Sequence, residues 1–361
     1  MRDLARSISE ATLTAYDSYV GNVDNADPRL METFSGPSRR LLEGGKRVRG
    51  LLSVAGAMCA GDDPHRLERA IEVAAALELF QGAALVHDDI MDESPTRRGI
   101  PAVHRAFALG FDNDGLTGDA DRFGRDAGIC SGDFLLAIST THILSHAPMS
   151  AVARFQSMCA EVAYGQYLDV RAENIDLAHA LTLEESDART VFLQARSNAF
   201  AVLRHKSAHY SVRDPLLIGA HAAGASEELL GQLSAVGAPL GEAFQLRDDA
   251  LGINGDPEIT GKPIGGDIRE GKRTVLTLTA LAATAGTEEA GTIVSSLGRD
   301  VSDREVRMIT DIMMSSGAWQ EHEDLIAQRE SAAHAAWKDL GPGPGRDLLG
   351  ELMDRLTSRT A

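Results

Sequence analysis

The chain has 361 residues, and 43 % of them are apolar, which is enough to bury a large core. Aspartate and glutamate together number 53, and lysine and arginine number 35, so the formal net charge at pH 7 is −18. A surface this acidic argues against nucleic acid or an anionic membrane as the main partner.

The cysteines and the first residues bear on the compartment. Cys59, Cys130 and Cys159 are an odd, widely spaced set in apolar stretches, which predicts reduced core thiols rather than disulfides or a metal site. The chain starts with a polar amphipathic segment that lacks the hydrophobic core of a signal peptide. No uninterrupted apolar run is long enough to span a bilayer. We therefore expect a soluble, cytoplasmic protein with no transmembrane segment.

Helix patterns dominate the chain from end to end. Apolar residues recur at three- and four-residue intervals, as in residues 70–86 and 192–203. Alternating strand patterns are nearly absent. These features predict one all-α domain over residues 1–361, a bundle of roughly a dozen helices. The chemical motifs lie in residues 44–274, and further helices are expected in residues 285–361.

Glycine, proline and polar clusters predict the loops between these helices. We expect loops at residues 24–37 and 112–126, the second of them solvated and mobile, and a helix end before Pro95. Residues 254–271 are dense in glycine and proline and predict a functional lid. Residues 341–345 alternate glycine and proline without the lysine and strand of a phosphate-binding loop, so we interpret them as a helix break.

Two aspartate-rich helical segments carry the strongest chemical signal. The first motif contains Asp88, Asp89 and Asp92, and the second contains Asp248 and Asp249. On a helix Asp88 and Asp92 lie on the same face, where carboxylates repel one another unless a cation lies among them. Mg²⁺ is the natural occupant, because it prefers one or two carboxylates together with phosphate oxygens. Both motifs follow apolar runs, so a solvated helix face is a minority interpretation.

Cationic residues lie near both motifs, as a diphosphate site requires. Lys46 and Arg49 are three residues apart at a predicted helix start, and Arg97 and Arg98 follow the first motif directly. Later in the chain come Lys206, Lys262 and Lys272. Taken singly, each is more often a surface residue than a ligand. Together they predict a site for two diphosphates, one held through metal and one through side chains.

The order of these motifs resembles the polyprenyl diphosphate synthase family, closest to geranylgeranyl diphosphate synthases. Over residues 44–274 the chain has, in succession, GGKRVR, DDIMD, RRG, SGD, GQYLD, KSAHY, FQLRDD, GKP and GKRT. The resemblance implies the all-α isoprenoid synthase fold around a central apolar cavity, usually in a homodimer. It also implies isopentenyl diphosphate and an allylic diphosphate as substrates, with about three Mg²⁺ ions per site.

The resemblance assigns metal and carbocation roles to matched positions. The residues implied to bind Mg²⁺ on the allylic diphosphate are Asp88, Asp89, Asp92 and Asp248, with Asp249 as a water-mediated partner. Gln166 and Asp169 would support the network of metal-bound water. Gln245, together with Ser207, would stabilise the carbocation.

It likewise assigns the two diphosphates to basic side chains. The allylic diphosphate would be held by Arg97, Lys206, Lys262 and Lys272. The diphosphate of isopentenyl diphosphate would be held by Lys46, Arg49 and Arg98. Gln81 stands where many relatives have histidine, and either residue can donate a hydrogen bond to phosphate.

Two positions depart from the family's pattern. Gly252 stands where the second motif usually has its third aspartate, which we interpret as a subgroup feature and not as a loss of activity. Gly50 replaces the proline that usually follows the first basic motif, and we expect this change to matter little.

The expected reaction is a head-to-tail condensation. Metal ions and cationic side chains stabilise the charge on the departing diphosphate, so the allylic C–O bond ionises. The alkene of isopentenyl diphosphate attacks the resulting cation. The resemblance implies that the released diphosphate then takes the proton, since no side-chain base stands out.

Product length should depend on the side chains below the first motif. Ala83 and Ala84 are too small to stop a growing tail, whereas Phe80, eight residues before Asp88, is large enough to form a floor. One helical turn of about 5.4 Å is close to one isoprene unit, so this deeper floor predicts the C20 product geranylgeranyl diphosphate.

Three other functions would be expected to leave a different sequence. A farnesyl or longer-chain synthase differs only in the floor. A class I terpene cyclase would need a different second metal motif, and a non-catalytic subunit of a heteromeric synthase would have lost a motif; this sequence fits neither. His142 and His146 are spaced like a zinc pair, but no glutamate follows His142, so we interpret them as part of a helix face. His87 is expected to orient a backbone group or a carboxylate.

Overall fold

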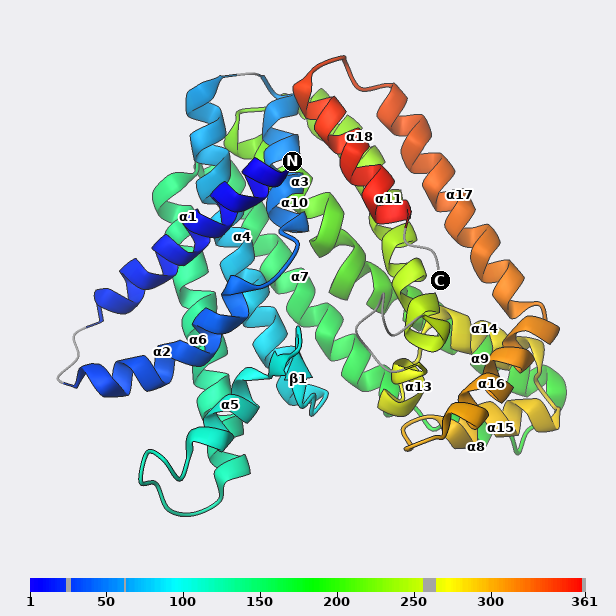
Figure 1. The fold of residues 1–361 in the computed structure, drawn as a ribbon. Helices are drawn as coiled ribbons and strands as arrows, with labels where there is room; N and C mark the ends of the chain where they lie inside the picture. Colours follow the sequence, from blue (N-terminus) through cyan, green and yellow to red (C-terminus); the bar gives the residue numbers. More distant parts are fainter. Residues whose placement is uncertain (24–26, 62, 256–263, 359–361) are drawn as a thin grey trace. The chain divides into compact units, whose positions relative to one another are not determined.

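The computed structural model describes residues 1–23, 27–61, 63–255 and 264–358 (Figure 1). It divides into two compact units. The first holds Met1–Gln156, Pro215–Leu230 and Gly341–Leu352, and the second holds Ser157–Asp214, Gly231–Leu340 and Met353–Ala361. The expectation of a single domain over residues 1–361 stays a prediction.

Helices make up nearly all the regular structure. Up to residue 156 they are α1 (Arg2–Gly21), α2 (Pro28–Glu43), α3 (Val48–Cys59), α4 (Pro64–Met91), α5 (Val103–Gly110), α6 (Ala120–His146) and the start of α7 (Met149–Glu173). Next come α8 (Leu177–Ala180), α9 (Glu185–Val202), the π-helix η1 (Leu203–Arg213), α10 (Asp214–Ala222) and α11 (Glu227–Asn254). The last are α13 (Gly266–Glu270), α14 (Val275–Ala283), α15 (Glu288–Ser296), α16 (Asp303–Ser315), α17 (Ala318–Lys338) and α18 (Pro344–Thr357). Two strands of two residues each, β1 (Thr96–Arg97) and β2 (Ile100–Pro101), pair antiparallel.

Helix α4 is the central element of the first unit. Asp63 caps it by accepting a hydrogen bond from the backbone N–H of His65, and Pro64 occupies the first helical position. Its middle is buried and, apart from Glu78, apolar, and α3 and α6 pack against it (Figure 1). Leu79 and Val86 are fully buried in a cluster with Tyr16 and Leu135. Each such aliphatic side chain stabilises the fold by about 1.5–3 kcal/mol, so the helix end that carries the first aspartate motif is firmly held.

The second unit has its own core around α9, α11 and α14. Phe192, Leu246 and Leu276 are fully buried in one cluster with residues of α15, α16 and α17. Nε2 of the buried His322 lies 2.8 Å from the carbonyl oxygen of Leu246, which fixes α17 against α11. The helix that carries the second aspartate motif is therefore also anchored in a core.

Three segments predicted as loops contain helix. In 24–37, α2 begins at Pro28 and continues through Pro37; in 112–126, α6 begins at Ala120; and in 254–271, α13 spans Gly266–Glu270. Aspartates taken as loop markers are N-caps, which explains the first two errors. Asp27 accepts a hydrogen bond from the backbone N–H of Arg29, and Asp119 accepts one from that of Arg122. Residues 256–263 of the predicted lid lie outside the described residues, so its role as a lid stays a prediction.

Other local predictions agree with the structure. Helix α4 ends at Met91, before Pro95, and α17 and α18 are separated at residues 339–343. The three cysteines are free thiols, and burial raises the pKa of Cys59 to about 11 and that of Cys159 to about 12. Cys130 is exposed, so its assignment to the core is wrong.

Helices α4 and α6 are long and apolar enough to cross a membrane by length and composition alone. Of the most apolar stretch in each, 67 % is buried within the protein for α4 and 44 % for α6, and core helices of soluble proteins have the same composition.

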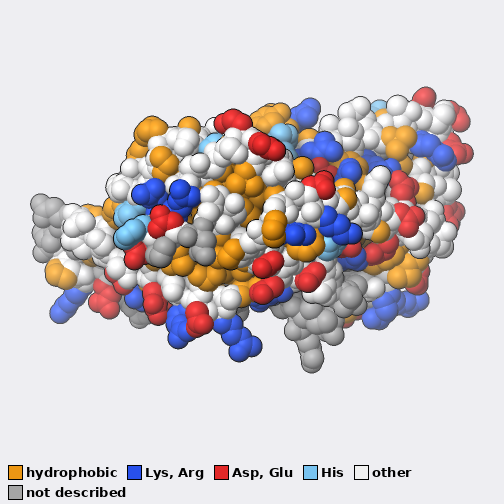
Figure 2. Space-filling view, turned by 90° about the horizontal axis from the view of Figure 1, so that it is seen from above, with side chains coloured by type: hydrophobic (Ala, Val, Ile, Leu, Met, Phe, Trp, Pro, Cys, Tyr) orange, Lys and Arg blue, Asp and Glu red, His pale blue; other side chains and the backbone are white. Residues whose placement is uncertain are grey.

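On the face in Figure 2, arginines and lysines occur in small groups beside aspartates and glutamates, not as a continuous basic surface.

Candidate active site

The first aspartate motif closes helix α4. Asp88 and Asp89 lie in its last turn and Asp92 is its C-cap. Asp89 is fully buried, and its Oδ2 has no hydrogen-bond partner among the residues that the structure describes. The pKa of Asp89 is raised to about 6, mainly by burial and to a smaller extent by Asp88 and Asp92, against the lowering effect of Arg97. A buried carboxylate with an unused oxygen is what a cation-binding motif requires.

Arg97 is the basic partner of this motif. Its Nε donates a hydrogen bond of 2.7 Å to Oδ1 of Asp89, and its guanidinium also lies 3.3 Å from Oδ2 of Asp88. The Arg97 side chain therefore contacts both Asp88 and Asp89 directly. An arginine here can bridge the motif and a phosphate group, because its planar head offers several donors.

The next residue, Arg98, turns back toward the first basic segment. Arg98 and Gly99 are the central residues of the β1–β2 hairpin, and both have positive φ, 56° and 76°, as a type I′ turn requires. The Arg98 guanidinium donates hydrogen bonds to the carbonyl oxygens of Leu41, at 2.8 Å, and Gly44. Burial and the nearby Arg47 and Arg49 lower the pKa of Arg98, while Glu78 raises it.

The first basic segment divides into structural and exposed groups. Arg47 is buried and forms an ion pair of 3.3 Å with the buried Glu78, which also accepts a hydrogen bond from the backbone N–H of Gly50. A proline at position 50 would lack that donor. Arg49 instead donates a hydrogen bond to the side chain of Gln81, so two residues predicted to bind phosphate are in contact. Lys46 stands just before α3 and is exposed.

In the second unit, Lys206 lies on the π-helix η1. It donates a hydrogen bond to Asp169 of α7, so two residues of the predicted set are in contact. π-Helical segments are rare and often occur at functional sites, because they shift the backbone register. Ser207 is the next residue of η1, and it is half-buried.

The second aspartate motif gains a carboxylate that the sequence did not predict. Burial raises the pKa of Asp249 well above its usual value, and Asp267, Asp248 and Asp169 raise it further. Gln245 donates a hydrogen bond of 3.4 Å to Asp249, which opposes the shift. Asp248 is exposed. Carboxylates from three elements, α7, α11 and α13, therefore gather in this unit.

Gly252 explains how Asp267 reaches the motif. A Cβ atom on Gly252 would lie 2.1 Å from Oδ2 of Asp267, far closer than such atoms approach. The departure at position 252 thus leaves the space that Asp267 of α13 occupies. The sequence signal was the absence of a side chain at 252, combined with an aspartate fifteen residues later in a segment interpreted as loop.

The remaining predicted residues near the motifs are Lys272, Lys262 and His87. Nζ of Lys272 forms an ion pair of 2.7 Å with Glu270. Lys262 lies outside the described residues. Nε2 of His87 lies 3.4 Å from Oδ1 of the exposed Asp133 without a hydrogen bond to a described residue, so the expectation that it orients a carboxylate stays a prediction. The two motifs belong to different units, so the expectation that they face one another stays a prediction.

The residues predicted to limit product length lie on α4. Phe80 is buried, and its ring meets that of Phe155 edge-on with a centroid separation of 5.8 Å. Ala83 is buried in the core cluster of the first unit, and Ala84 is half-buried. Phe80 is thus a fixed aromatic group two helical turns below Asp88.

Comparison with known proteins identifies the family. The sequence profile named polyprenyl synthetase matches residues 31–313. A geranylfarnesyl diphosphate synthase of Aeropyrum pernix is 32 % identical over 310 residues, which cover 84 % of this chain and 85 % of that protein. A geranylgeranyl diphosphate synthase of Saccharolobus solfataricus is 31 % identical over 271 residues, covering 73 % and 70 % respectively.

A solved structure is similar over the whole chain. The crystal structure of a geranylgeranyl pyrophosphate synthase from Corynebacterium glutamicum, complexed with isoprenyl diphosphate and magnesium, superposes with a TM-score of 0.85. The two sequences are 36 % identical, and the match covers 99 % of each chain. The chain therefore belongs to the polyprenyl synthetase family and is a trans-prenyl diphosphate synthase, a transferase with the all-α isoprenoid synthase fold.

Proposed function

We propose that the chain condenses isopentenyl diphosphate with an allylic diphosphate and releases geranylgeranyl diphosphate. The observation that carries this proposal is the state of the two aspartate motifs. In each unit a carboxylate with a raised pKa, Asp89 or Asp249, lies among further carboxylates. Basic groups lie close by, Arg97 in the first unit and Lys206 in the second.

The donor set fits Mg²⁺. It consists of carboxylate oxygens without sulfur or imidazole, and the buried Oδ2 of Asp89 is available to a cation. When bound, Mg²⁺ supplies positive charge that stabilises the carboxylates and the departing diphosphate. We assign its ligands to Asp88, Asp89, Asp92 and Asp248, with Asp249 and Asp267 as supporting carboxylates. About three ions per site would match a diphosphate and two such motifs.

The basic residues divide the work of binding. Arg97 and Lys206, already in contact with carboxylates of the site, are assigned to the allylic diphosphate, with Lys262 and Lys272 as further cations. Lys46, Arg49, Gln81 and Arg98 are assigned to isopentenyl diphosphate. The hydrogen bonds from Arg98 to Leu41 and Gly44, and from Arg49 to Gln81, support this second group. Such preorganised donors lower the barrier without reorganising during the reaction.

Ser207 and Gln245 are assigned to the region of the carbocation. Gln245 is oriented by its hydrogen bond to Asp249, and Ser207 lies on the irregular backbone of η1. Polar oxygens at this point can stabilise positive charge without a basic group that would remove a proton too early. Water must be kept from this region, because it would convert the cation to an alcohol.

The C20 product is assigned from Phe80. Relatives of nearly equal identity are named for different products, geranylfarnesyl and geranylgeranyl diphosphate, so overall similarity does not select the length. Phe80 is held against Phe155, and Ala83 and Ala84 place no large side chain between it and the motif. A cytoplasmic homodimer completes the proposal, and the exposed apolar side chains Ile129 and Leu144 on α6 favour a partner surface there.

One assay tests the activity. Purified protein, Mg²⁺ and isopentenyl diphosphate are incubated with dimethylallyl, geranyl or farnesyl diphosphate in turn, and the dephosphorylated products are sized by mass spectrometry. We expect a linear C20 alcohol. Asp248→Asn should abolish elongation, whereas Asp311→Asn, an exposed aspartate on α16, should leave it unchanged. No elongation with any primer would contradict the proposal, and cyclised hydrocarbons would favour a terpene cyclase.

A further inference from the structure

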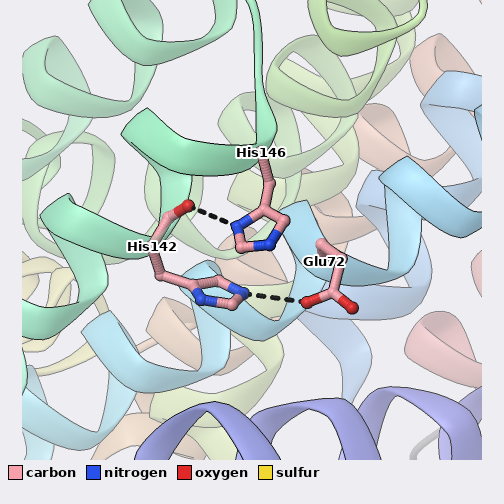
Figure 3. A group of neighbouring side chains, drawn as sticks. All are labelled: Glu72, His142 and His146. Atoms are coloured by element: carbon pink, nitrogen blue, oxygen red, sulfur yellow. Dashed lines mark hydrogen bonds and ion pairs between the residues drawn. The ribbon is translucent and has the colours of Figure 1, made fainter. Parts of the chain in front are cut away.

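We propose that Glu72, His142 and His146 form a zinc site where the last turn of α6 meets α4. One ligand atom from each residue lies within 4.8 Å of the other two. Figure 3 shows the two imidazole rings of α6 lying one over the other, with the carboxylate of Glu72 on α4 facing them. Glu72, on another helix, thus places a carboxylate beside the histidine pair as a candidate third ligand.

The side chains already approach the geometry of a ligand set. Nε2 of His142 lies 3.0 Å from Oε2 of Glu72, and the ring centroids of the two histidines are 4.2 Å apart. Ligand atoms of a tetrahedral zinc ion are about 3.3 Å apart. Small rotations of side chains would therefore suffice. Two histidines and one glutamate leave a fourth position for water, and nitrogen ligands favour Zn²⁺ over Mg²⁺.

A hydrogen bond fixes the tautomer of His146. Its Nδ1 lies 2.8 Å from the backbone carbonyl oxygen of His142, and a carbonyl only accepts, so Nδ1 carries the proton. In neutral His146 the other nitrogen, Nε2, then has a lone pair for a metal. Such a second hydrogen bond is what orients metal-binding histidines in proteins. At His142 zinc would replace the proton now shared with Glu72, and that proton would pass to the solvent.

The burial of the three residues fits a metal site that is fixed by the core on one side and open to ions from solvent on the other. His142 is buried, and the ring of Tyr19 on α1 meets it edge-on at 6.0 Å. Glu72 is half-buried and His146 is exposed. The pKa of Glu72 is lowered by the hydrogen bond from His142 and by the two histidines. Among the described residues no arginine or lysine contributes to that shift.

A second cluster in the other unit makes a useful contrast. Glu161, His205 and His209 also bring three ligand atoms together. There the guanidinium of Arg213 lies 3.1 Å from Nε2 of His209 and 3.3 Å from Oε2 of Glu161. The protein thus already supplies a cation, which would repel a metal ion. Of the two clusters found among the described residues, the one on α4 and α6 has three ligand atoms close together and no arginine bound to them.

The proposed zinc site is remote from the aspartate motif. Glu72 precedes Asp88 on α4 by more than four helical turns, about 24 Å. Zinc there would act on structure and not on the reacting atoms: it would tie the end of α6 to α4, the helix that carries the motif. Binding to the folded state alone would raise the thermal stability of the protein.

The test uses full-length protein without an affinity tag. Zn²⁺ is added in the presence of millimolar Mg²⁺, which fills the oxygen-ligand aspartate sites, and bound zinc is measured by mass spectrometry after dialysis. We expect one zinc ion per chain and a higher Tm with zinc. Glu72→Gln and His146→Gln should each lower zinc affinity at least about tenfold and remove the rise in Tm. His146 is exposed, so its replacement leaves folding intact.

His209→Gln is the matched control, because it removes one histidine of a similarly spaced pair. It should bind zinc as the wild type does. The proposal is overturned if wild-type protein retains no zinc, or if His146→Gln retains as much as the wild type. Loss of zinc in His209→Gln but not in His146→Gln would place the ion at the other cluster and would equally overturn it.

Discussion

The two aspartate motifs solve the same electrostatic problem in different ways. In the first, Asp88 and Asp89 lie in the last turn of α4 and Asp92 is its C-cap, and Arg97 from the adjacent hairpin pairs with the first two. In the second, Asp248 and Asp249 on α11 are joined by Asp267 from α13, in the space left by Gly252. The first motif thus carries its own counter-charge, whereas carboxylates predominate in the second.

This difference indicates how each motif is specified. The first is local: every member lies between residues 88 and 97, so one helix end and one hairpin determine it. The second is assembled from separate elements and depends on a missing side chain. Pairing by an arginine lowers the free energy of a buried carboxylate, and gathering carboxylates raises it unless a cation binds. The second motif should therefore depend more strongly on metal.

The largest expected effect is at the arginine of the first motif. Arg97→Gln removes the charge next to Asp88 and Asp89 and a side chain that we assign to the allylic diphosphate, so kcat/KM should fall about 10³-fold. Arg105→Gln is the control, because Arg105 forms an exposed ion pair with Asp121 and should change activity little. Steady-state kinetics with farnesyl diphosphate measure both. Equal losses in the two variants would show that the first motif does not rely on its arginine.

The second motif can be challenged at Gly252. A side chain there meets Asp267 at 2.1 Å, so Gly252→Asp should displace Asp267 and lower kcat about 10²-fold. If the space between the two positions is what matters, adding Asp267→Gly to this variant should restore activity to within about tenfold of the wild type. Gly291→Asp, at a helical glycine with open space, is the control. A double variant no better than Gly252→Asp would contradict the exchange of carboxylates.

The sequence predicted the local motif better than the assembled one, for physical reasons. Apolar periodicity and breakers determine helices over short stretches, so the all-α fold and the positions of Asp88, Asp89 and Asp92 followed directly. Asp267 lies in a short helix within a segment rich in glycine, and its packing in the space beside Gly252 places it near Asp249. No local pattern encodes that contact.

The β1–β2 hairpin was missed for a different reason. Its strands have two residues each, too short for any alternation of apolar and polar side chains. Arg98-Gly99 was identified as a basic motif, yet the turn itself is what directs the Arg98 guanidinium to the carbonyl oxygens of Leu41 and Gly44. The His142–Glu72 contact was likewise invisible, because its two residues are seventy positions apart.

A pH titration distinguishes the motifs without substrate. The pKa of Asp89 is about 6 in the folded protein and 3.8 in the unfolded chain, so the folded state holds the extra proton between these values. Without metal, the contribution of Asp89 to stability is therefore complete below about pH 4 and is lost as pH rises through about 6, by up to about 3 kcal/mol. Urea unfolding between these pH values measures the loss. Asp89→Asn should abolish it, and Mg²⁺ should offset it in the wild type.

If the wild type and Asp89→Asn show the same pH dependence, the carboxyl group of Asp89 is not held protonated by burial. The pH dependence of stability would then have to come from groups other than Asp89. Asp249→Asn supplies the corresponding measurement in the second unit, where the pKa is raised in the same direction by burial and by Asp267. A larger stabilisation by Mg²⁺ of the wild type than of Asp249→Asn would support the stronger metal dependence of the second motif.

The smallest expected change in rate, and the largest in product, comes from Phe80. It lies on the same helix as the first motif and packs against Phe155, so Phe80→Ala should deepen the apolar space and shift the product from C20 to C25, with turnover changed little. Phe192→Leu, in the core of the second unit, removes a comparable buried ring and should keep the C20 product. Product masses decide the matter. An unchanged C20 product from Phe80→Ala would mean that Phe80 is not the floor below the first motif. Another side chain would then limit the product length.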